Sequence, residues 1–278
     1  MVTIEDLTFW YSKQNRIFEK LNLKLDAGHI YGLLGKNGAG KTTLLKLICG
    51  LSFPKSGTVA IDGLIPARRE PGFLADIFLV PEEISVPSLN PGKFADIHGC
   101  FYPAFDPFKF GEFLEKFEVD ANQNFSGMSH GQKKKTMIAF ALATNTRYLF
   151  LDEPTNGLDI ISKADFRSML AAYFSEEKTI ILSTHMVRDL ESMIDSVIIL
   201  ENHKIILNQA LDQIAQKLTF GHSSLSASPG EMIYSVKSEL GTTMISLNPS
   251  GISGNVDIEA LFNACINIPD QISSLFEH

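Results

Sequence analysis

Apolar and polar residues alternate near the start of the chain and then give way to continuous apolar runs. Leucines at positions 21, 23 and 25 are separated by polar side chains, which is the period of two expected of a half-buried strand. The later runs at residues 29–34, 148–151 and 179–183 are largely apolar. Such runs are typical of parallel strands buried on both faces, whose carboxyl ends carry the functional site. We therefore expect an antiparallel edge sheet beside a parallel core.

Helical patterns and turn signals separate these strands. Residues 41–49 have leucine and isoleucine at helical spacing before Gly50, and Asp62-Gly63 is typical of a hairpin turn. Prolines interrupt helical patterns from about residue 83 to 145, which predicts a mostly helical insertion. Beyond that insertion the core resumes and extends to about residue 217.

The composition changes after about residue 218. The stretch 221–230 is rich in serine and glycine and resembles a linker. Short strands are expected at residues 232–236 and 243–247, and a last helix near Asp257. The chain is thus predicted to divide into a main domain, residues 1–217, and a small C-terminal appendage, residues 218–278.

Composition and charge exclude some classes of protein. The 278 residues are 45% hydrophobic and carry a formal net charge of −8, which argues against a protein that coats nucleic acid. The start has no basic segment before an apolar core, and no apolar run reaches the roughly 18 residues of a membrane helix, so we expect a cytoplasmic chain. Cys49, Cys100 and Cys265 lack metal or disulfide spacing and are expected to be buried thiols.

The strongest chemical motif is Gly35-Lys-Asn-Gly-Ala-Gly-Lys41-Thr42, which matches the phosphate loop G-x-x-x-x-G-K-[ST] between a strand and a helix. Its glycines let backbone N–H groups approach phosphate oxygens, while Lys41 reaches the β and γ phosphates and Thr42 ligates Mg²⁺. The alternative is a glycine turn that only links strand to helix.

Two acidic residues follow the next buried strand. Asp152 is suited to hold Mg²⁺, and Glu153 is suited to orient and deprotonate an attacking water. A solvated strand end is the alternative. Ser129 and Gln132 fit a capping box, which predicts a helix start with free N–H groups, although a capped helix alone implies no function.

These motifs together resemble those of ATP-binding-cassette (ABC) proteins. Met128-Ser-His-Gly-Gln132 resembles the LSGGQ signature, and Leu149-Phe-Leu-Asp-Glu-Pro-Thr-Asn-Gly-Leu-Asp159 resembles the Walker B strand and D-loop. The resemblance covers about residues 1–215. It implies an α/β fold: a P-loop NTPase (RecA-like) core with an antiparallel β subdomain and a helical insertion, here with a small C-terminal α+β appendage.

The resemblance also implies individual roles. Tyr11 stands where the family has an aromatic residue stacked on adenine, the alternative being a buried aromatic of an edge strand. His185 matches the switch histidine that contacts the γ-phosphate, whereas a lone histidine would usually be structural. Glu82 occupies the Q-loop position, where the family typically has Gln, and adds a negative charge.

The expected ATP site is therefore shared between two cassettes, paired about a two-fold axis, with each ATP between one phosphate loop and the opposite signature. A homodimer would have two competent sites. The catalytic residues are Glu153, His185 and Lys41, and Mg²⁺ is held by Thr42, Asp152 and Glu82. The expected nucleotide contacts are Tyr11, Gly35, Asn37, Gly38, Ala39, Gly40, Lys41, Thr42, Thr43, Glu82, Ser129, Gly131, Gln132 and Asp159.

Residues 101–110 look similar to a segment of bacterial cassettes that serve ABC-2-type exporters. This implies an integral membrane transporter subunit as partner, docked on the helical insertion, and a place on the inner face of the cell membrane. Core packing of the same aromatic residues is the alternative. A soluble ABC ATPase that acts in protein or cofactor assembly is the competing function, and a regulatory module with structural ATP is a third.

Two features depart from the family or suggest other partners. His130 stands where the family has Gly, and we expect it to be tolerated. Lys133-Lys134-Lys135 could indicate nucleic-acid contact, but in a helix first turn beside an anionic nucleotide a solvated or field-shaping face is the simpler interpretation, so no nucleic-acid partner is expected.

Overall fold

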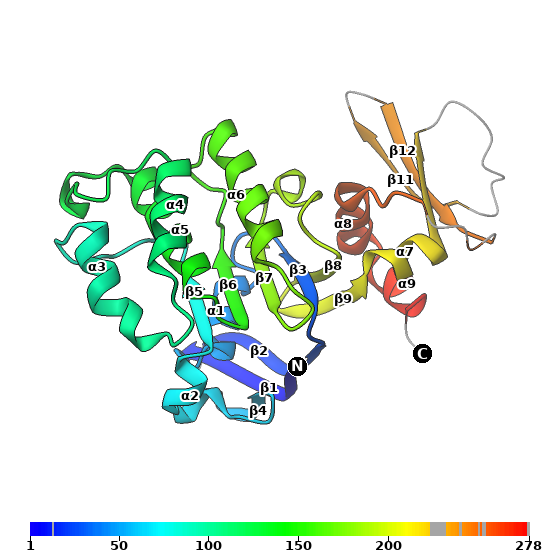
Figure 1. Cartoon of the computed structure of the whole chain (residues 1–278). Helices are drawn as coiled ribbons and strands as arrows, with labels where there is room; N and C mark the ends of the chain where they lie inside the picture. The colour runs from blue at the N-terminus through cyan, green and yellow to red at the C-terminus, as the bar shows by residue number, and fades with distance from the viewer. Residues whose placement is uncertain (13, 223–231, 239–240, 250, 252–253, 277–278) are drawn as a thin grey trace.

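A computed structural model describes residues 1–12, 14–222, 232–238, 241–249, 251 and 254–276. Its centre is a six-stranded sheet in the order β5-β6-β7-β3-β8-β9 (Figure 1). Neighbouring strands are parallel except for the β8–β9 pair. The strands are β3 (His29–Leu34), β5 (Ile77–Val80), β6 (Tyr148–Asp152), β7 (Thr179–Thr184), β8 (Ser196–Glu201) and β9 (Lys204–Ala210). The predicted buried parallel strands are therefore confirmed.

The predicted antiparallel edge sheet is also present. It has the order β2-β1-β4, formed by β1 (Val2–Ser12), β2 (Asn15–Leu25) and β4 (Ser56–Ile61). The three alternating leucines of β2 are buried and the polar residues between them are exposed, as the period of two predicts. Asp62 and Gly63 have φ angles of 48° and 77° and form a two-residue turn, but the second arm is limited to the bridge between Ile61 and Leu64.

Helices cover the core sheet and extend beyond its β5 edge. They are α1 (Lys41–Ile48), α2 (Pro71–Leu74), α3 (Pro91–His98), α4 (Pro107–Lys116), α5 (His130–Ala143), α6 (Ile160–Tyr173) and α7 (Leu211–Lys217). Phe140 of α5 lies at the centre of an aromatic cluster, with ring centroids of Phe78, Phe94 and Phe105 at 5.6, 5.0 and 5.2 Å from its own. This cluster joins the helical region to strand β5.

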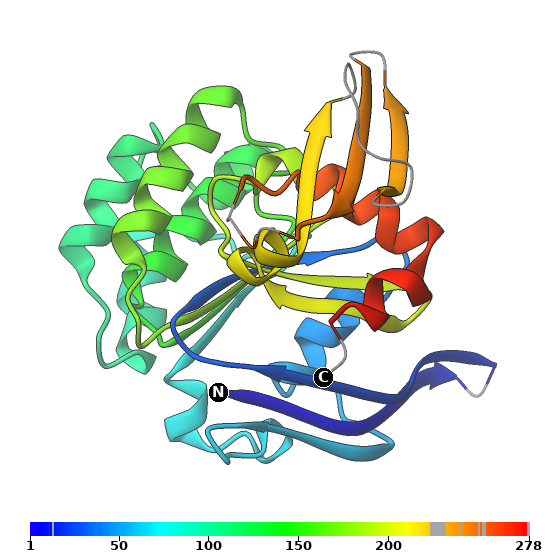
Figure 2. The same cartoon turned by 90° about the vertical axis from the view of Figure 1, so that its right-hand side faces the viewer.

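The C-terminal residues lie beside β9, on the side of the molecule opposite the helical region (Figures 1 and 2). They form a sheet in the order β10-β12-β11, from β10 (Leu218–His222), β12 (Gly241–Leu247) and β11 (Met232–Ser238), with helices α8 (Ile258–Asn267) and α9 (Pro269–Ser274). The expected strands and last helix are confirmed. Gly221 and His222 belong to β10, so the linker prediction is wrong there, and its remainder lies outside the described residues.

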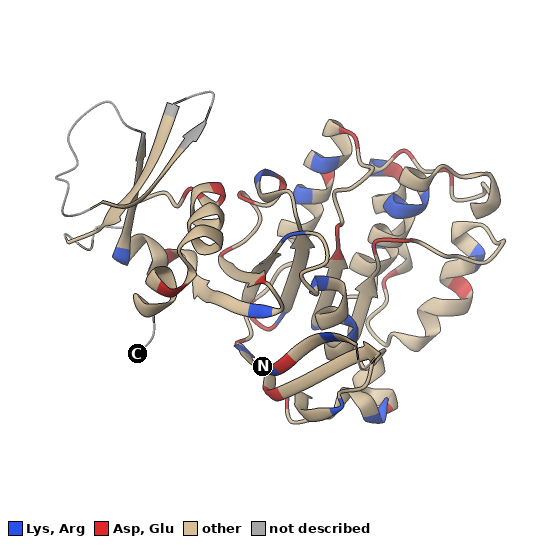
Figure 3. Cartoon of the chain, turned by 180° about the vertical axis from the view of Figure 1, so that it is seen from behind, with Lys and Arg blue, Asp and Glu red and all other residues tan. Residues whose placement is uncertain are grey.

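Three further observations bear on the expectations from the sequence. Cys49 and Cys265 are buried, but Cys100 is exposed, because it follows α3 on a short turn at the surface. No helix within the described ranges has the length and apolarity needed to cross a membrane. Lys and Arg are interspersed with Asp and Glu along the helices and strands (Figure 3).

Candidate functional site

The phosphate loop connects β3 to α1 and is shaped by glycines with two different tasks. Gly38 and Gly40 have φ angles of 81° and 111°, in the left-handed region that residues with a side chain rarely adopt. Gly35 is needed for space, because a Cβ atom there would lie 2.4 Å from the carbonyl oxygen of Leu200 in β8. The loop is thereby packed against the sheet and leads into the start of α1, and the first N–H groups of a helix are suited to bind an anion.

Lys41 is held inside this loop. Its Nζ donates hydrogen bonds to the carbonyl oxygens of Gly35 at 2.7 Å and Lys36 at 3.3 Å, and lies 3.8 Å from Oε1 of Glu153. Burial lowers the pKa of Lys41, while the carboxylates of Glu153 and Asp152 act in the opposite direction. The cation is thus placed between the loop that would hold phosphates and the carboxylate pair.

Asp152 is fixed by two hydroxyl groups at the end of β6. Thr42 Oγ1 donates to its Oδ2 at 2.6 Å, and Ser183 Oγ donates to its Oδ1. The second contact follows from sheet register, which pairs Asp152 with Ser183 across β6 and β7. One carboxylate therefore links the start of α1 to the end of a neighbouring strand.

Glu153 is the next residue, and its backbone has left β-strand geometry. Its φ of 47° lies in the left-handed region, an uncommon state for a non-glycine residue, and its side chain is buried. Thr184 Oγ1 donates to Oε2 at 3.1 Å, and His185 Nδ1 lies 2.8 Å from Oε1. Residues from β7 and the loop after it thus hold a buried carboxylate in one orientation.

A cavity of about 550 Å³ opens over these groups. It is lined by Tyr11, Asn15, Ile17, Asn37, Gly38, Gly40, Lys41, Thr42, Thr43, Glu82, Asp152, Glu153, His185 and His203. The structure therefore brings most of the predicted nucleotide and catalytic residues to one place. Tyr11 is 58% exposed, so the alternative of a buried edge-strand aromatic is wrong; its hydroxyl lies 3.3 Å from Thr43 Oγ1.

Other predicted residues do not line this cavity. Gly35 and Ala39 belong to the loop but do not line the cavity; the Gly35 carbonyl accepts from Lys41, and the Ala39 carbonyl accepts from His203. Ser129 and Gln132 form the predicted capping box at the start of α5, with bonds of 3.2 and 2.9 Å. A Cβ atom added at Gly131 would lie 2.9 Å from the carbonyl oxygen of Gly157.

Asp159 also lies elsewhere, as the cap of α6. Its side chain accepts from Ser162 N at 2.8 Å and forms an ion pair with Lys135 at 3.2 Å. The bonds from Ser162 are the main reason that the pKa of Asp159 is lowered. The signature segment and Asp159 are thus separate from the phosphate loop of the same chain.

Three residues that line the cavity belong to none of the sequence motifs. Asn15 and Ile17 belong to β2, and His203 lies in the turn between β8 and β9, where Nδ1 is 3.0 Å from the Ala39 carbonyl oxygen. The polar break Glu201-Asn-His-Lys204 between apolar runs marks the turn in the sequence, but nothing there indicates that it meets the phosphate loop.

The interpretation of Lys134 as part of a solvated face is wrong. Its side chain is fully buried, and Nζ donates to the carbonyl oxygens of Glu82 at 3.1 Å and Asp152 at 3.2 Å. The reason is helical phase: residue 134 lies one turn before Ile138, on the face of α5 that packs on the core. Lys135 instead reaches the exposed Asp159.

The donor set near Asp152 fits Mg²⁺ rather than a transition metal. Thr42, Asp152 and Glu82 offer only oxygen atoms, the ligands that Mg²⁺ prefers. Among the described residues, no cluster of His, Cys, Asp and Glu side chains suffices to hold a metal ion alone. In nucleotide sites Mg²⁺ typically binds one or two carboxylates plus phosphate oxygens.

Comparison with known proteins gives consistent matches. A sequence model described as "ABC transporter" matches residues 18–156, half of the chain. The chain is 28% identical over 211 residues to the ABC transporter ATP-binding protein YtrB of Bacillus subtilis, covering 73% of this chain and 70% of YtrB. It is 30% identical over 214 residues to the lantibiotic transport ATP-binding protein SrtF of Streptococcus pyogenes, covering 76% and 92%.

Solved structures agree on the fold. The structure of an ATP-binding subunit of an ABC transporter superposes with a TM-score of 0.70 at 25% identity, covering 78% of this chain and 92% of that one. The dimeric post-hydrolysis structure of the cassette MJ0796, bound to ADP and Pi, gives a TM-score of 0.66 at 23% identity, covering 76% and 98%.

Proposed function

The chain belongs to the ABC transporter family, and on that premise we propose that it is the ATP-hydrolysing subunit of an exporter. The observation that carries this proposal is the convergence on Glu153, where Lys41, Thr184 and His185 surround one buried carboxylate. A chain that only stored ATP would not need a carboxylate held in this way beside the phosphate loop.

Each residue then has a defined task. Lys41 leaves its carbonyl partners to bind the β and γ phosphates, while backbone N–H groups of the loop and the start of α1 bind the remaining oxygens. Glu153 accepts the proton of the attacking water, and His185 and Thr184 keep its carboxylate aimed at that water. Tyr11 lies at the mouth of the cavity, where an adenine ring would stack.

Thr42, Asp152 and Glu82 would hold Mg²⁺ with the nucleotide. The cation, when bound, supplies charge neutralisation at the phosphate oxygens. The Thr42–Asp152 hydrogen bond of 2.6 Å already places hydroxyl and carboxylate oxygens side by side, as a shared ligand pair requires.

A second copy of the chain completes the site. Ser129, Gly131 and Gln132 lie away from the cavity of their own chain, at the capped start of α5. In a two-fold dimer the free N–H groups and positive end of this helix face the partner's γ-phosphate. ATP then holds two chains together, and its hydrolysis releases them, which is the mechanical output.

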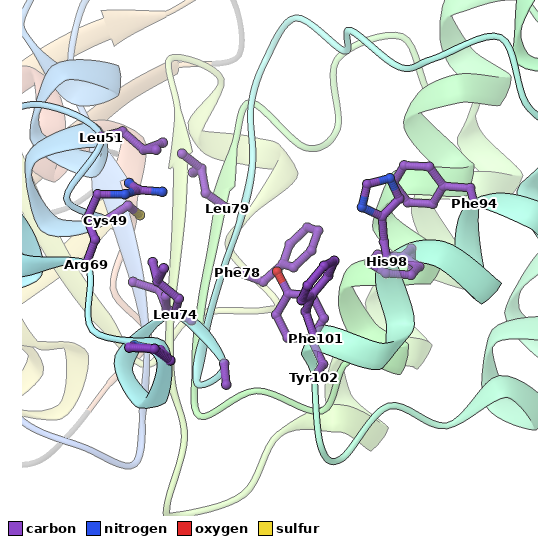
Figure 4. Close-up of a pocket in the computed structure, with 14 residues that line it drawn as sticks. Cys49, Leu51, Arg69, Leu74, Phe78, Leu79, Phe94, His98, Phe101 and Tyr102 are labelled. Carbon is purple, nitrogen blue, oxygen red and sulfur yellow. The ribbon is translucent and has the colours of Figure 1, made fainter.

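The membrane partner docks in a second, apolar groove of about 600 Å³ (Figure 4). This groove lies between the α1–α2 region and the helical region, and its lining includes Leu51, Leu74, Phe78 and Phe101. Phe101 is 66% exposed although it is a large aromatic, whereas Phe110 is buried. The aromatic segment therefore serves core packing and an apolar surface at once, and a short helical segment of an integral membrane subunit is the occupant we propose.

Transport is favoured over a soluble assembly function by the names of the relatives. They include a lantibiotic transport protein, a bacitracin transport protein and a Nod factor export protein.

We also assign residues 1–217 to the ATPase domain, with the helical subdomain at about 83–145, and residues 218–278 to the appendage. We propose that the chain associates with the membrane through its partner subunit.

Replacing Glu153 with Gln tests the assignment of the base. Because the variant keeps the shape and loses the proton acceptor, kcat for ATP should fall by about 10²–10⁴-fold. An ATP-bound dimer should accumulate and be visible by size-exclusion chromatography. The matched control is Glu177→Gln, an exposed residue before β7, which should hydrolyse ATP at the parent rate. Parent-rate hydrolysis by Glu153→Gln would remove Glu153 from the mechanism.

A further inference from the structure

Three carboxylates gather around the cavity that is proposed to bind ATP. Glu82, Asp152 and Glu153 all line it, and the nucleotide itself is an anion. Apart from the Mg²⁺ that would bind with the nucleotide, Lys41 is the one cationic side chain that the mechanism has used so far, and it interacts electrostatically with all three carboxylates. A site with this much negative charge needs further compensation before it will accept a polyanion.

Lys134 supplies a second cation from behind the site. Its side chain is fully buried, and its Nζ donates to the carbonyl oxygens of Pro81 at 3.4 Å, Glu82 at 3.1 Å and Asp152 at 3.2 Å. These acceptors come from two segments, the loop after β5 and the end of β6. A single ammonium group therefore joins the backbone of Glu82 to the backbone of Asp152.

Burying a lysine is costly, so this position requires an explanation. An ammonium ion loses hydration that hydrogen bonds to neutral carbonyl groups replace only in part. Burial accordingly lowers the pKa of Lys134, and the carboxylates of Asp152, Glu82 and Glu153, in that order, act in the opposite direction. The buried cation and the three carboxylates thus stabilise one another across the backbone that separates them.

We propose that Lys134 is a positioning residue of the hydrolysis site: its ammonium holds residues 81–82 against the end of β6 and offsets the carboxylate that Glu82 adds beside Asp152 and Glu153. This proposal rests on the proposed function, since it concerns the same nucleotide cavity. Its specific consequence is that the effects of Lys134 and Glu82 on anion binding depend on each other.

The test measures the affinity for ADP without Mg²⁺, in EDTA, by isothermal titration of the full chain. Under these conditions hydrolysis and the metal ion play no part, and repulsion between carboxylates and phosphates is measured directly. Lys134→Met should weaken ADP binding by about fivefold or more, within the range of couplings found in one interaction network. Glu82→Gln added to Lys134→Met should restore most of that loss.

The control is Lys133→Met, which removes the same charge from the partly exposed neighbouring position and should leave the affinity for ADP unchanged. Lys134→Gln is the second variant, because it keeps a hydrogen-bond donor without the charge. It should show the same loss and the same rescue by Glu82→Gln. A thermal melt of each variant identifies any that do not fold.

Two results would overturn the proposal. One is an unchanged affinity for ADP in folded Lys134→Met and Lys134→Gln. The other is a loss that Glu82→Gln does not restore in either background, which would show that Lys134 acts on packing alone. A parent chain that binds ADP yet hydrolyses no ATP would contradict the proposed function. The interdependence of Lys134 and Glu82 in ADP binding could still be measured in such a chain.

Discussion

Gly35 shows how one residue ties the phosphate loop to the sheet. A Cβ at this position would lie 2.4 Å from the carbonyl oxygen of Leu200 and 3.3 Å from Cβ of Ala39. The first contact is with backbone of a buried strand, which cannot rotate away as a flexible side chain would. Gly35 is therefore required by close approach, whereas Gly38 and Gly40 are required by their positive φ angles.

Gly35→Ala should push the loop away from β8 and move the Gly35 carbonyl that accepts from Lys41. We expect a loss of nucleotide affinity of about tenfold or more, together with destabilisation of about 1–3 kcal/mol from overpacking. Isothermal titration with ADP and urea denaturation measure the two effects. Gly111→Ala is the control, since Gly111 lies inside α4 with open space around it, and it should stabilise the chain by about 0.5–1 kcal/mol. Parent-like ADP binding by Gly35→Ala would show that the loop tolerates the added methyl group.

At the scale of single residues, the sequence predicts some residues of the site but not others. Lys41, Thr42, Asp152 and Glu153 follow from motifs because their chemistry needs fixed spacing along the chain. Lys134 and His203 do not, because their partners are backbone carbonyls of residues far away in sequence. A run of three lysines reads as a solvated face unless the packing of its helix is known.

At the scale of elements, helix α5 connects the signature segment to the nucleotide cavity and to strand β5. Its first turn carries the capping box, its second turn carries Lys134, and Phe140 in its third turn joins the aromatic cluster with Phe78 of β5. The presence of this helix follows from the sequence, through its cap and apolar spacing. Its contacts do not, because the aromatic partners come from four separate segments.

Two aromatic residues of the helical region distinguish docking of a partner from packing of the core. Phe101→Ala removes an exposed groove residue, so stability should change by less than about 0.5 kcal/mol. Recovery of an integral membrane protein with the tagged chain from detergent extracts should fall severalfold. Phe140→Ala removes a buried ring and should cost about 3–5 kcal/mol. Recovery of soluble partners only, with either the parent or the variant, would support an assembly function instead.

For the whole molecule, the strand order places the helical region and the C-terminal appendage at opposite ends of one sheet. The helical region with its apolar groove lies at the β5 edge, and the C-terminal appendage lies at the β9 edge (Figure 1). The nucleotide cavity lies between them. The appendage was predictable as strands and a helix, but its docking was not, since α8 packs on the segment that follows His185 through Arg188–Glu259 and apolar contacts.

Through this docking the appendage shares a hydrophobic core with part of residues 1–217, and the β2-β1-β4 sheet packs in a second core. Leu261, Ala264 and Cys265 of α8 are fully buried in the same cluster as Val187 and Leu190, which follow His185. A shared core of this kind predicts that the appendage and the rest of the chain unfold together, not as independent domains. The chain contains one tryptophan, Trp10 in β1, which reports on the opposite sheet.

Leu261→Ala should therefore shift the unfolding of a distant sheet. The cavity should lower the free energy of unfolding by about 2–5 kcal/mol, and Trp10 fluorescence and far-UV circular dichroism should show the same shifted urea midpoint. Arg188→Ala is the matched control at this interface, because its ion pair with Glu259 is exposed and its loss should leave the urea midpoint close to that of the parent chain. If Leu261→Ala moves the dichroism midpoint but leaves the Trp10 transition in place, the appendage is an independent unit, and the segment after His185 is stable without it.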